Sequence, residues 1–328
     1  MTPQAATSPL SSYQKIFVTG HSGLVGSAIV RALKLRGFKN ILTANSKDLN
    51  LLDRDRVHAF LEAEKPDLIF HAAGRVGGIH ANDTFPAEFL SENLQMQLNV
   101  MDAANAIDCQ RLIFLGSSCI YPKHAPQPIQ ESALLTGHLE ATNDAYAIAK
   151  IAGITHVQAS RRQYGRSWVA AMPCNLFGPG DNYHPTNSHF LPSLIRRYEE
   201  ARRSGQSSVE NWGSGSPLRE VLYVDDLAKA LLTIAEAYDE QEVINVGSGV
   251  EMSISEYAQV VAEAVGFQGK TVWDATRPDG TPRKVLDNSK ISDFGWTPEV
   301  DVRTGISLAL ADFRSREDEN AKRNKVVT

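Results

Sequence analysis

Three polar side chains, Ser117, Tyr146 and Lys150, have the types and the spacing of a proton-transfer site. Tyr146 and Lys150 lie four residues apart in YAIAK (146–150), so they share one face of a helix. A free tyrosine has a pKa of about 10, and a nearby ammonium group lowers that value, so Lys150 is expected to lower the pKa of Tyr146. Ser117 follows the apolar run 112–115 and can hydrogen-bond the same substrate oxygen. The set predicts carbonyl reduction with a nicotinamide cofactor; the alternative is an ordinary surface pair on a helix.

A cysteine follows this serine in GSSCIYPK (116–123), where a plain reductase has no need for a thiol. A free cysteine ionises near pH 8.5, and a neighbouring cation such as a protonated histidine or Lys150 favours the thiolate. Cys119 could therefore serve as a base. On residue type alone, a small buried hydrophobic residue is the more common role of a free cysteine, and both interpretations stay open at this point.

The segment TGHSGLVG (19–26) places Gly20, Gly23 and Gly26 between an expected strand and an expected helix. Glycines there permit a tight turn and a close approach of the backbone to a pyrophosphate at the helix N-terminus. The position in a strand–turn–helix unit favours dinucleotide binding over a turn that only packs a helix on a sheet. Cofactor contacts are also predicted for Ser22, Leu24 and Val25.

The end of the second expected strand, TANSKDLN (43–50), bears on which dinucleotide is bound. A carboxylate directly after that strand would select NAD, whereas a basic residue accepts a 2′-phosphate. Ser46 and Lys47 stand there and favour NADP(H), although Asp48 follows and Lys47 could instead be a solvated surface charge.

Apolar segments alternate with amphipathic segments through the first half of the chain. This alternation predicts an α/β fold with a doubly wound parallel sheet of the Rossmann type. The expected strands are 15–20, 40–44, 67–74, 111–118 and 168–175, and the expected helices are 27–37, 55–66, 89–108 and 145–165.

The pattern becomes irregular after residue 176, which suggests a smaller C-terminal substrate-binding domain. We expect a dinucleotide-binding domain over 14–176, with 220–247 returning to it. The substrate-binding domain would comprise 177–219 and 248–313, and 1–13 and 314–328 would be flexible tails.

The composition of the 328-residue chain narrows the function further. A net charge of −5 argues against nucleic acid and anionic membranes as partners. No apolar run approaches the ~18 residues that a membrane-spanning helix needs. The three cysteines, Cys109, Cys119 and Cys174, fit no metal-site spacing, so we expect no metal and a reducing, cytoplasmic compartment.

Five motifs together resemble the extended short-chain dehydrogenase/reductases. They are TGHSGLVG, HAAGRVGG, GSSCIYPK, YAIAK and NWGSGSPLRE. With RVGGIHAN and HPTNSH, residues 15–310 look like the branch that acts on GDP-4-keto-6-deoxy-D-mannose. The resemblance implies a GDP-sugar substrate, NADPH, epimerisation at carbons 3 and 5, and reduction of the 4-keto group to give GDP-L-fucose.

The resemblance also assigns site residues. It implies Cys119 as base and His189 as acid of the epimerising pair, with the direction at each carbon left open. Substrate contacts are implied for Arg197, Trp212, Arg219, Asp279 and Lys284. Further cofactor contacts are implied for Asn50, Leu51, Leu115, Gly116, Ser118, Lys150, Pro173, Asn175, Leu176 and His189.

Other functions and one departure from the pattern stay open. Many members of this branch have arginine where this chain has Ser22 and Ser46, which leaves Lys47 to hold a 2′-phosphate.

A 4-epimerase of the same superfamily would retain NAD and need no Cys–His pair. A non-catalytic dinucleotide sensor would lack Tyr146 or Lys150. A homodimer through 89–108 and 145–165 is also expected from the superfamily.

Overall fold

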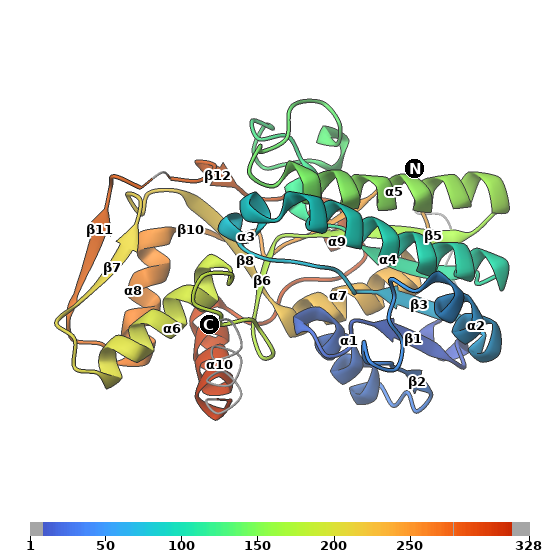
Figure 1. Ribbon diagram of the computed structural model, residues 1–328, viewed down its shortest axis with the longest axis horizontal. Coiled ribbons are helices and arrows are strands. Elements are labelled where there is room, and N and C mark those ends of the chain that lie inside the picture. Colours follow the sequence, from blue (N-terminus) through green and yellow to red (C-terminus); the bar gives the residue numbers. More distant parts are fainter. Residues whose placement is uncertain (1–8, 278, 317–328) are drawn as a thin grey trace.

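The computed structural model describes residues 9–277 and 279–316 (Figure 1). Its large sheet has six parallel strands in the order β2-β1-β3-β4-β5-β9. Their bounds are β1 (Ile16–Thr19), β2 (Ile41–Leu42), β3 (Leu68–His71), β4 (Arg111–Leu115), β5 (Ser167–Pro173) and β9 (Ile244–Val246). The chain adds β2 on one side of β1 and β3 on the other, and this switch in strand order places a ligand-binding crevice at the carboxyl ends of β1 and β3.

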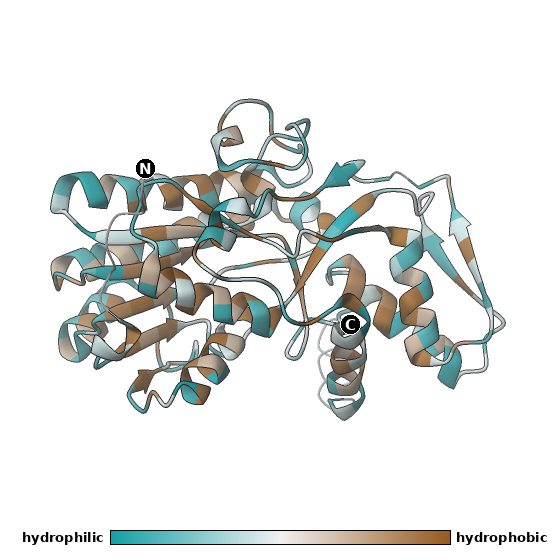
Figure 2. Cartoon of the chain, turned by 180° about the vertical axis from the view of Figure 1, so that it is seen from behind, coloured by the Kyte–Doolittle hydropathy of each residue, from teal (hydrophilic) through white to brown (hydrophobic). Residues whose placement is uncertain are grey.

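Two layers of helices cover this sheet (Figure 1). One layer pairs α1 (Leu24–Leu35) with α7 (Val224–Ala237), and the other packs α4 (Pro86–Ala106) between α2 (Arg54–Glu64) and α5 (Asp144–Tyr164). Because both faces are covered, every residue of β1, β3 and β4 is buried, and most of these residues are apolar (Figure 2). The predicted doubly wound parallel sheet is confirmed.

A second, smaller unit lies beside the large sheet. Its sheet has the order β10-β8-β12, with β6 also paired to β8. The strands are β6 (Asn175–Phe177), β8 (Leu218–Tyr223), β10 (Glu251–Ser253) and β12 (Arg283–Lys284), and the helices are α6 (Phe190–Arg203), α8 (Ile254–Val265) and α10 (Val302–Ser315). Phe177, Tyr198 and Val261 belong to a hydrophobic core of its own.

An outlying ribbon of two parallel strands, β7 (Ser208–Trp212) and β11 (Lys270–Asp274), extends from the smaller unit. Figure 1 shows it at the end of the molecule farthest from β1 and β2. The remaining short helices are α3 (Ile79–Thr84), α9 (Ser289–Asp293), η1 (Leu10–Ser12), η2 (Ser118–Ile120) and η3 (Glu131–Ala133).

The segment 220–247 divides between the two sheets. Helix α7 and strand β9 pack on the large sheet as expected, but β8 pairs with β6, β10 and β12 in the smaller one. The buried carboxylate of Glu220 helps to fix β8 there, because it accepts hydrogen bonds from the backbone of Gly249 (2.6 Å) and Leu286 (2.9 Å). The expectation that the segment returns as a whole is wrong for this strand.

The inner ends of both predicted tails are ordered. Leu10, in η1, is 1% exposed, and the Arg314 guanidinium in α10 donates to Glu199 at 2.8 and 3.0 Å. The rest of these predicted tails, 1–8 and 317–328, lies outside the described residues. In the part of the chain that the structure describes, no helix combines the length and the apolar character required to span a membrane.

Candidate active site

The glycine turn (residues 19–26) lies at the switch in strand order of the large sheet. Gly20 has a φ of +66°, and a Cβ there would lie 2.8 Å from the Cα of Ala73, just beyond β3. A Cβ on Gly26, in the first turn of α1, would lie 2.1 Å from the carbonyl oxygen of Gly20. Only glycines permit this approach of strand, turn and helix N-terminus. The turn therefore fits a dinucleotide pyrophosphate.

Two alanine substitutions should separate the roles of the glycines in this turn. We expect Gly26→Ala to lower the free energy of unfolding by about 1–3 kcal/mol, since its methyl group overlaps a backbone oxygen. Gly23→Ala is the matched control, because its Cβ would lie 3.4 Å from the same oxygen, an ordinary contact. Urea unfolding of both variants measures the difference, and equal stabilities would contradict the assigned packing role.

The loop after β2 presents Lys47 to solvent. Asn45 organises this loop, because its side-chain oxygen accepts from the backbone N–H of Lys47 (2.9 Å) and its amide pairs with Asp48. Asp48 is thus already partnered, and Lys47 is left as the basic side chain at this strand end. Asn50 is exposed and Leu51 half-buried beyond it.

Ser117 and Cys119 stand where β4 ends and η2 begins. The Ser117 hydroxyl accepts a hydrogen bond from the backbone N–H of Cys119 at 3.2 Å, which caps the short helix. Both side chains are half-buried, whereas Ser118 between them is buried. The strand end thus directs Ser117 and Cys119 toward the carboxyl edge of the sheet.

Tyr146 lies in the first turn of α5 and Lys150 one turn later. Burial raises the pKa of Tyr146, the nearby Cys119 raises it further, and a hydrogen bond with Ser117 lowers it. The expected lowering by Lys150 is therefore wrong for this state of the protein. The Lys150 nitrogen instead lies 5.9 Å from the centre of the Tyr146 ring and donates to the Leu115 carbonyl at 2.8 Å. Tyr146 is consequently a protonated phenol that can act as an acid.

Burial also disfavours the charged form of Lys150, which is 4% exposed. Desolvation lowers the pKa of Lys150 to about 8. His71 lies nearby at the end of β3, and burial, then Lys150, lower its pKa to about 3. Because His71 remains neutral, it adds no second positive charge beside the ammonium group.

Two cations approach Cys119 from the smaller sheet. The Lys284 nitrogen, on β12, lies 3.6 Å from the Cys119 sulfur. Arg219, on β8, interacts electrostatically with Cys119 and with Asp279, which keep its charge favourable although burial lowers its pKa. The cation beside the thiol is thus Lys284 rather than Lys150. Sequence reasoning missed this because the two residues are 165 positions apart.

The remaining predicted substrate residues lie on the outlying ribbon, after it and on α6. Trp212 is 65% exposed at the end of β7, and the Arg277 guanidinium lies 4.9 Å from its ring centre. Asp279 accepts hydrogen bonds from the backbone N–H (2.9 Å) and hydroxyl (2.7 Å) of Ser214. Arg197, in α6, donates to the Glu210 carbonyl at 3.0 Å. Arg277 was not anticipated, although its place in ATRPDG beside Asp279 was a usable signal.

His189 precedes α6 as its N-cap residue. The loop before it contacts the loop after β3, where the backbone N–H of Gly78 donates to Asn187 at 3.3 Å. The residue as a whole is exposed at the surface, and desolvation of its ring lowers the pKa of His189. Among the described residues, no hydrogen bond joins it to Cys119.

The other predicted cofactor residues lie at the carboxyl edge of the large sheet. Leu115, Gly116 and Pro173 are buried there, and Asn175 and Leu176 are half-buried in β6. A Cβ on Gly116 would lie 2.3 Å from the terminal carbon of Met172, so the Met172 side chain would have to move to accept a larger residue. Asn175 donates to the Glu220 carbonyl at 3.0 Å.

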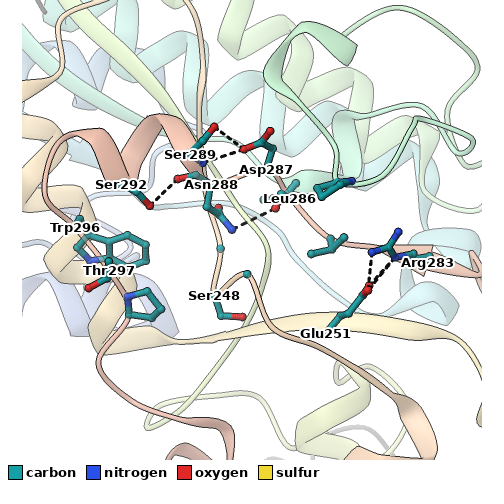
Figure 3. A pocket seen from close by; sticks show the side chains of 15 residues that line it. Ser248, Glu251, Arg283, Leu286, Asp287, Asn288, Ser289, Ser292, Trp296 and Thr297 are labelled. Carbon is teal, nitrogen blue, oxygen red and sulfur yellow. Dashed lines mark hydrogen bonds and ion pairs between the residues drawn. The ribbon is translucent and has the colours of Figure 1, made fainter.

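A pocket of about 470 Å³ lies beside β12 and contains none of the five predicted catalytic residues. Figure 3 shows the Arg283–Glu251 ion pair on one side of it and Trp296 and Thr297 on the other. We place the chemistry at the strand ends instead, because the titratable groups converge there. Within 9–277 and 279–316, no cluster of three or more His, Cys, Asp or Glu residues could hold a metal ion.

Comparison with known proteins agrees with this geometry. A model of the "NAD dependent epimerase/dehydratase family" matches residues 16–247. GDP-L-fucose synthase 1 of Arabidopsis thaliana is 55% identical over 293 residues, 89% of this chain and 91% of that protein. GDP-L-fucose synthase of Escherichia coli (strain K12) is 46% identical over 316 residues, 94% of this chain and 98% of that protein.

A solved GDP-L-fucose synthetase from Naegleria fowleri, bound to NADP, has a TM-score of 0.85 at 28% identity and covers 92% of this chain and 94% of its own. Family model, sequence relatives and solved structure thus agree. The chain belongs to the NAD dependent epimerase/dehydratase family, on the branch of the GDP-L-fucose synthases.

Proposed function

We propose that this protein converts GDP-4-keto-6-deoxy-D-mannose to GDP-L-fucose by epimerisation at carbons 3 and 5 and NADPH-dependent reduction at carbon 4. The observation that carries the proposal is the convergence of Tyr146, Ser117, Cys119 and Lys284 at one strand end. A plain reductase needs Tyr146 and Ser117 with Lys150, but neither Cys119 nor Lys284. A thiol beside a cation adds a base, which inversion at carbon requires.

In the reductive half, bound NADPH supplies a hydride to carbon 4 of the sugar. Tyr146 donates its phenolic proton to the ketone oxygen, and Ser117 hydrogen-bonds that same oxygen. Lys150, held on the Leu115 carbonyl, stabilises the phenolate left behind. The raised pKa of Tyr146 supports this direction, since the group must carry a proton when reduction begins.

In the epimerising half, the carbonyl at carbon 4 acidifies the hydrogens on carbons 3 and 5. We assign Cys119 as the base that removes one of these hydrogens as a proton. The electron pair of the broken C–H bond is delocalised onto the carbonyl oxygen. His189 then returns a proton to the same carbon from the opposite face. Cys119 has gained one proton and His189 has lost one, so exchange with water resets the pair.

Incubation with NADPH and GDP-4-keto-6-deoxy-D-mannose tests this function. Nicotinamide absorbance follows the reduction, and NMR identifies the sugar. Loss of NADPH with formation of GDP-L-fucose is the expected result. Reduction to a 6-deoxy sugar that is not inverted would remove the role of Cys119, and absence of turnover would contradict the proposal.

Lys47 is proposed to hold the 2′-phosphate of NADPH, since it is the basic side chain exposed beyond β2. We expect Lys47→Glu to weaken NADPH binding by about 10–100-fold, as for loss of a hydrogen bond to a charged group, and to leave NADH binding nearly unchanged. Fluorescence titration with both nucleotides measures this. Lys39→Glu, at the other end of β2, is the control, and an equal effect there would contradict the assignment.

We further propose a homodimer through α4 and α5 in a reducing, cytoplasmic compartment. Leu98 in α4 and Ile148 in α5 are 43% and 47% exposed, which supports an apolar contact between subunits. Cys109, Cys119 and Cys174 are free thiols, which supports a reducing compartment.

A further inference from the structure

Strand β12 presents two adjacent cations to opposite sides of the smaller sheet. Arg283 lines the pocket of Figure 3, where its guanidinium forms hydrogen bonds of 2.6–3.0 Å to the Glu251 carboxylate. Lys284 instead reaches Cys119, with 3.6 Å between nitrogen and sulfur. Since successive side chains of a strand alternate in direction, one residue anchors the strand and the next serves the site.

We propose that Lys284 is a positioning residue that holds the Cys119 sulfur as a thiolate by a direct ion pair. The resemblance implies a contact between Lys284 and the substrate, and the 3.6 Å distance adds a contact between Lys284 and the thiol. An opposite charge within about 4–6 Å stabilises the charged form of a titrating group. The thiolate's use as the epimerising base rests on the proposed function; the ion pair itself does not.

The other charged and titratable groups around the pair support this assignment. Arg219, on β8, adds a second positive charge facing Cys119, while Tyr146, on α5, is a neutral phenol because burial and Cys119 raise its pKa. Cys174 also interacts with Lys284, but burial and Glu220 raise its pKa well above the ordinary value. The 3.6 Å contact therefore pairs Lys284 with Cys119.

Alkylation of the whole protein by iodoacetamide tests the pair without any sugar. Cys109 and Cys174 are 3% and 7% exposed, so mass spectrometry can follow Cys119 as the accessible thiol. The pH at which its alkylation rate is half-maximal should rise by about 1–3 units in Lys284→Met. Lys284→Arg should restore it. Lys39→Met, which removes an exposed lysine before β2, should leave it unchanged.

An unchanged midpoint in Lys284→Met, with NADPH binding retained as proof of folding, would overturn the proposal. Should that variant fail to fold, Lys284→Gln gives the same comparison. With sugar present, we expect Lys284→Met to slow proton exchange at carbon 3 or 5 while KM changes less than about twofold. A raised KM with an unshifted midpoint would make Lys284 a substrate contact only. A shifted midpoint without sugar turnover would uphold the ion pair and contradict the proposed function.

Discussion

Replacement of Tyr146 by phenylalanine is expected to slow NADPH-dependent ketone reduction by roughly 10²–10⁴-fold, the usual contribution of general acid catalysis. The variant loses the proton that the ketone oxygen must receive. It keeps the ring, which lies edge-on to Phe89 with 6.3 Å between centres. NADPH binding and proton exchange at carbons 3 and 5 should therefore persist. Stopped-flow absorbance and nucleotide titration measure the two properties separately.

Tyr164→Phe provides the matched control, because Tyr164 is 50% exposed at the other end of the same helix. This control should reduce the ketone at the wild-type rate. Wild-type reduction by Tyr146→Phe would exclude Tyr146 as the proton donor. If Tyr146→Phe loses both NADPH binding and ketone reduction, the hydroxyl has a structural role instead.

Cys119→Ser is expected to give the second large effect, a loss of roughly 10²–10⁴-fold in proton exchange at carbon 3 or 5. A serine hydroxyl is far less acidic than a thiol, so the neighbouring Lys284 has no anion to stabilise. Incorporation of deuterium from heavy water, followed by NMR, measures exchange directly. Because the glycine turn and Lys150 are unaltered, NADPH should bind as before.

Cys109→Ala is the control for the removal of a thiol that lies outside the proposed site. Cys109 is buried just before β4, at the opposite end of the strand from Cys119, with its sulfur 3.3 Å from the Arg111 carbonyl oxygen. Exchange in this variant should match the wild type. Full exchange in Cys119→Ser would refute the assigned base and leave only the reductive residues in place.

Local sequence pattern was sufficient to predict most of the large sheet. Strands such as β3 and β4 are buried throughout, so their apolar runs are continuous, and Asp53 caps α2 as its position before the helix indicates. The partner of β8 could not be predicted in this way. An apolar strand fits either sheet, and the hydrogen bonds that Glu220 accepts come from residues 29 and 66 positions away.

The electrostatics of the site depended on the same long-range information. YAIAK correctly places Tyr146 and Lys150 on one helix face, yet their spacing cannot reveal that burial outweighs the ammonium group at the phenol. Likewise, GSSCIYPK marks Cys119 but not its cation, which the fold supplies from β12. Residue type and spacing predicted that Tyr146, Lys150 and Cys119 belong to the site. The protonation of these side chains depends on the residues that pack around them, which the spacing does not show.

The β7–β11 ribbon lies at the end of the molecule farthest from β1 and β2 (Figure 1). Trp212, at the end of β7, stacks with Arg277, which follows β11, whereas the proposed proton-transfer residues lie at η2, α5 and β12. Under the proposed function, we expect mutations in the ribbon to change nucleotide binding without displacing the proposed proton-transfer residues.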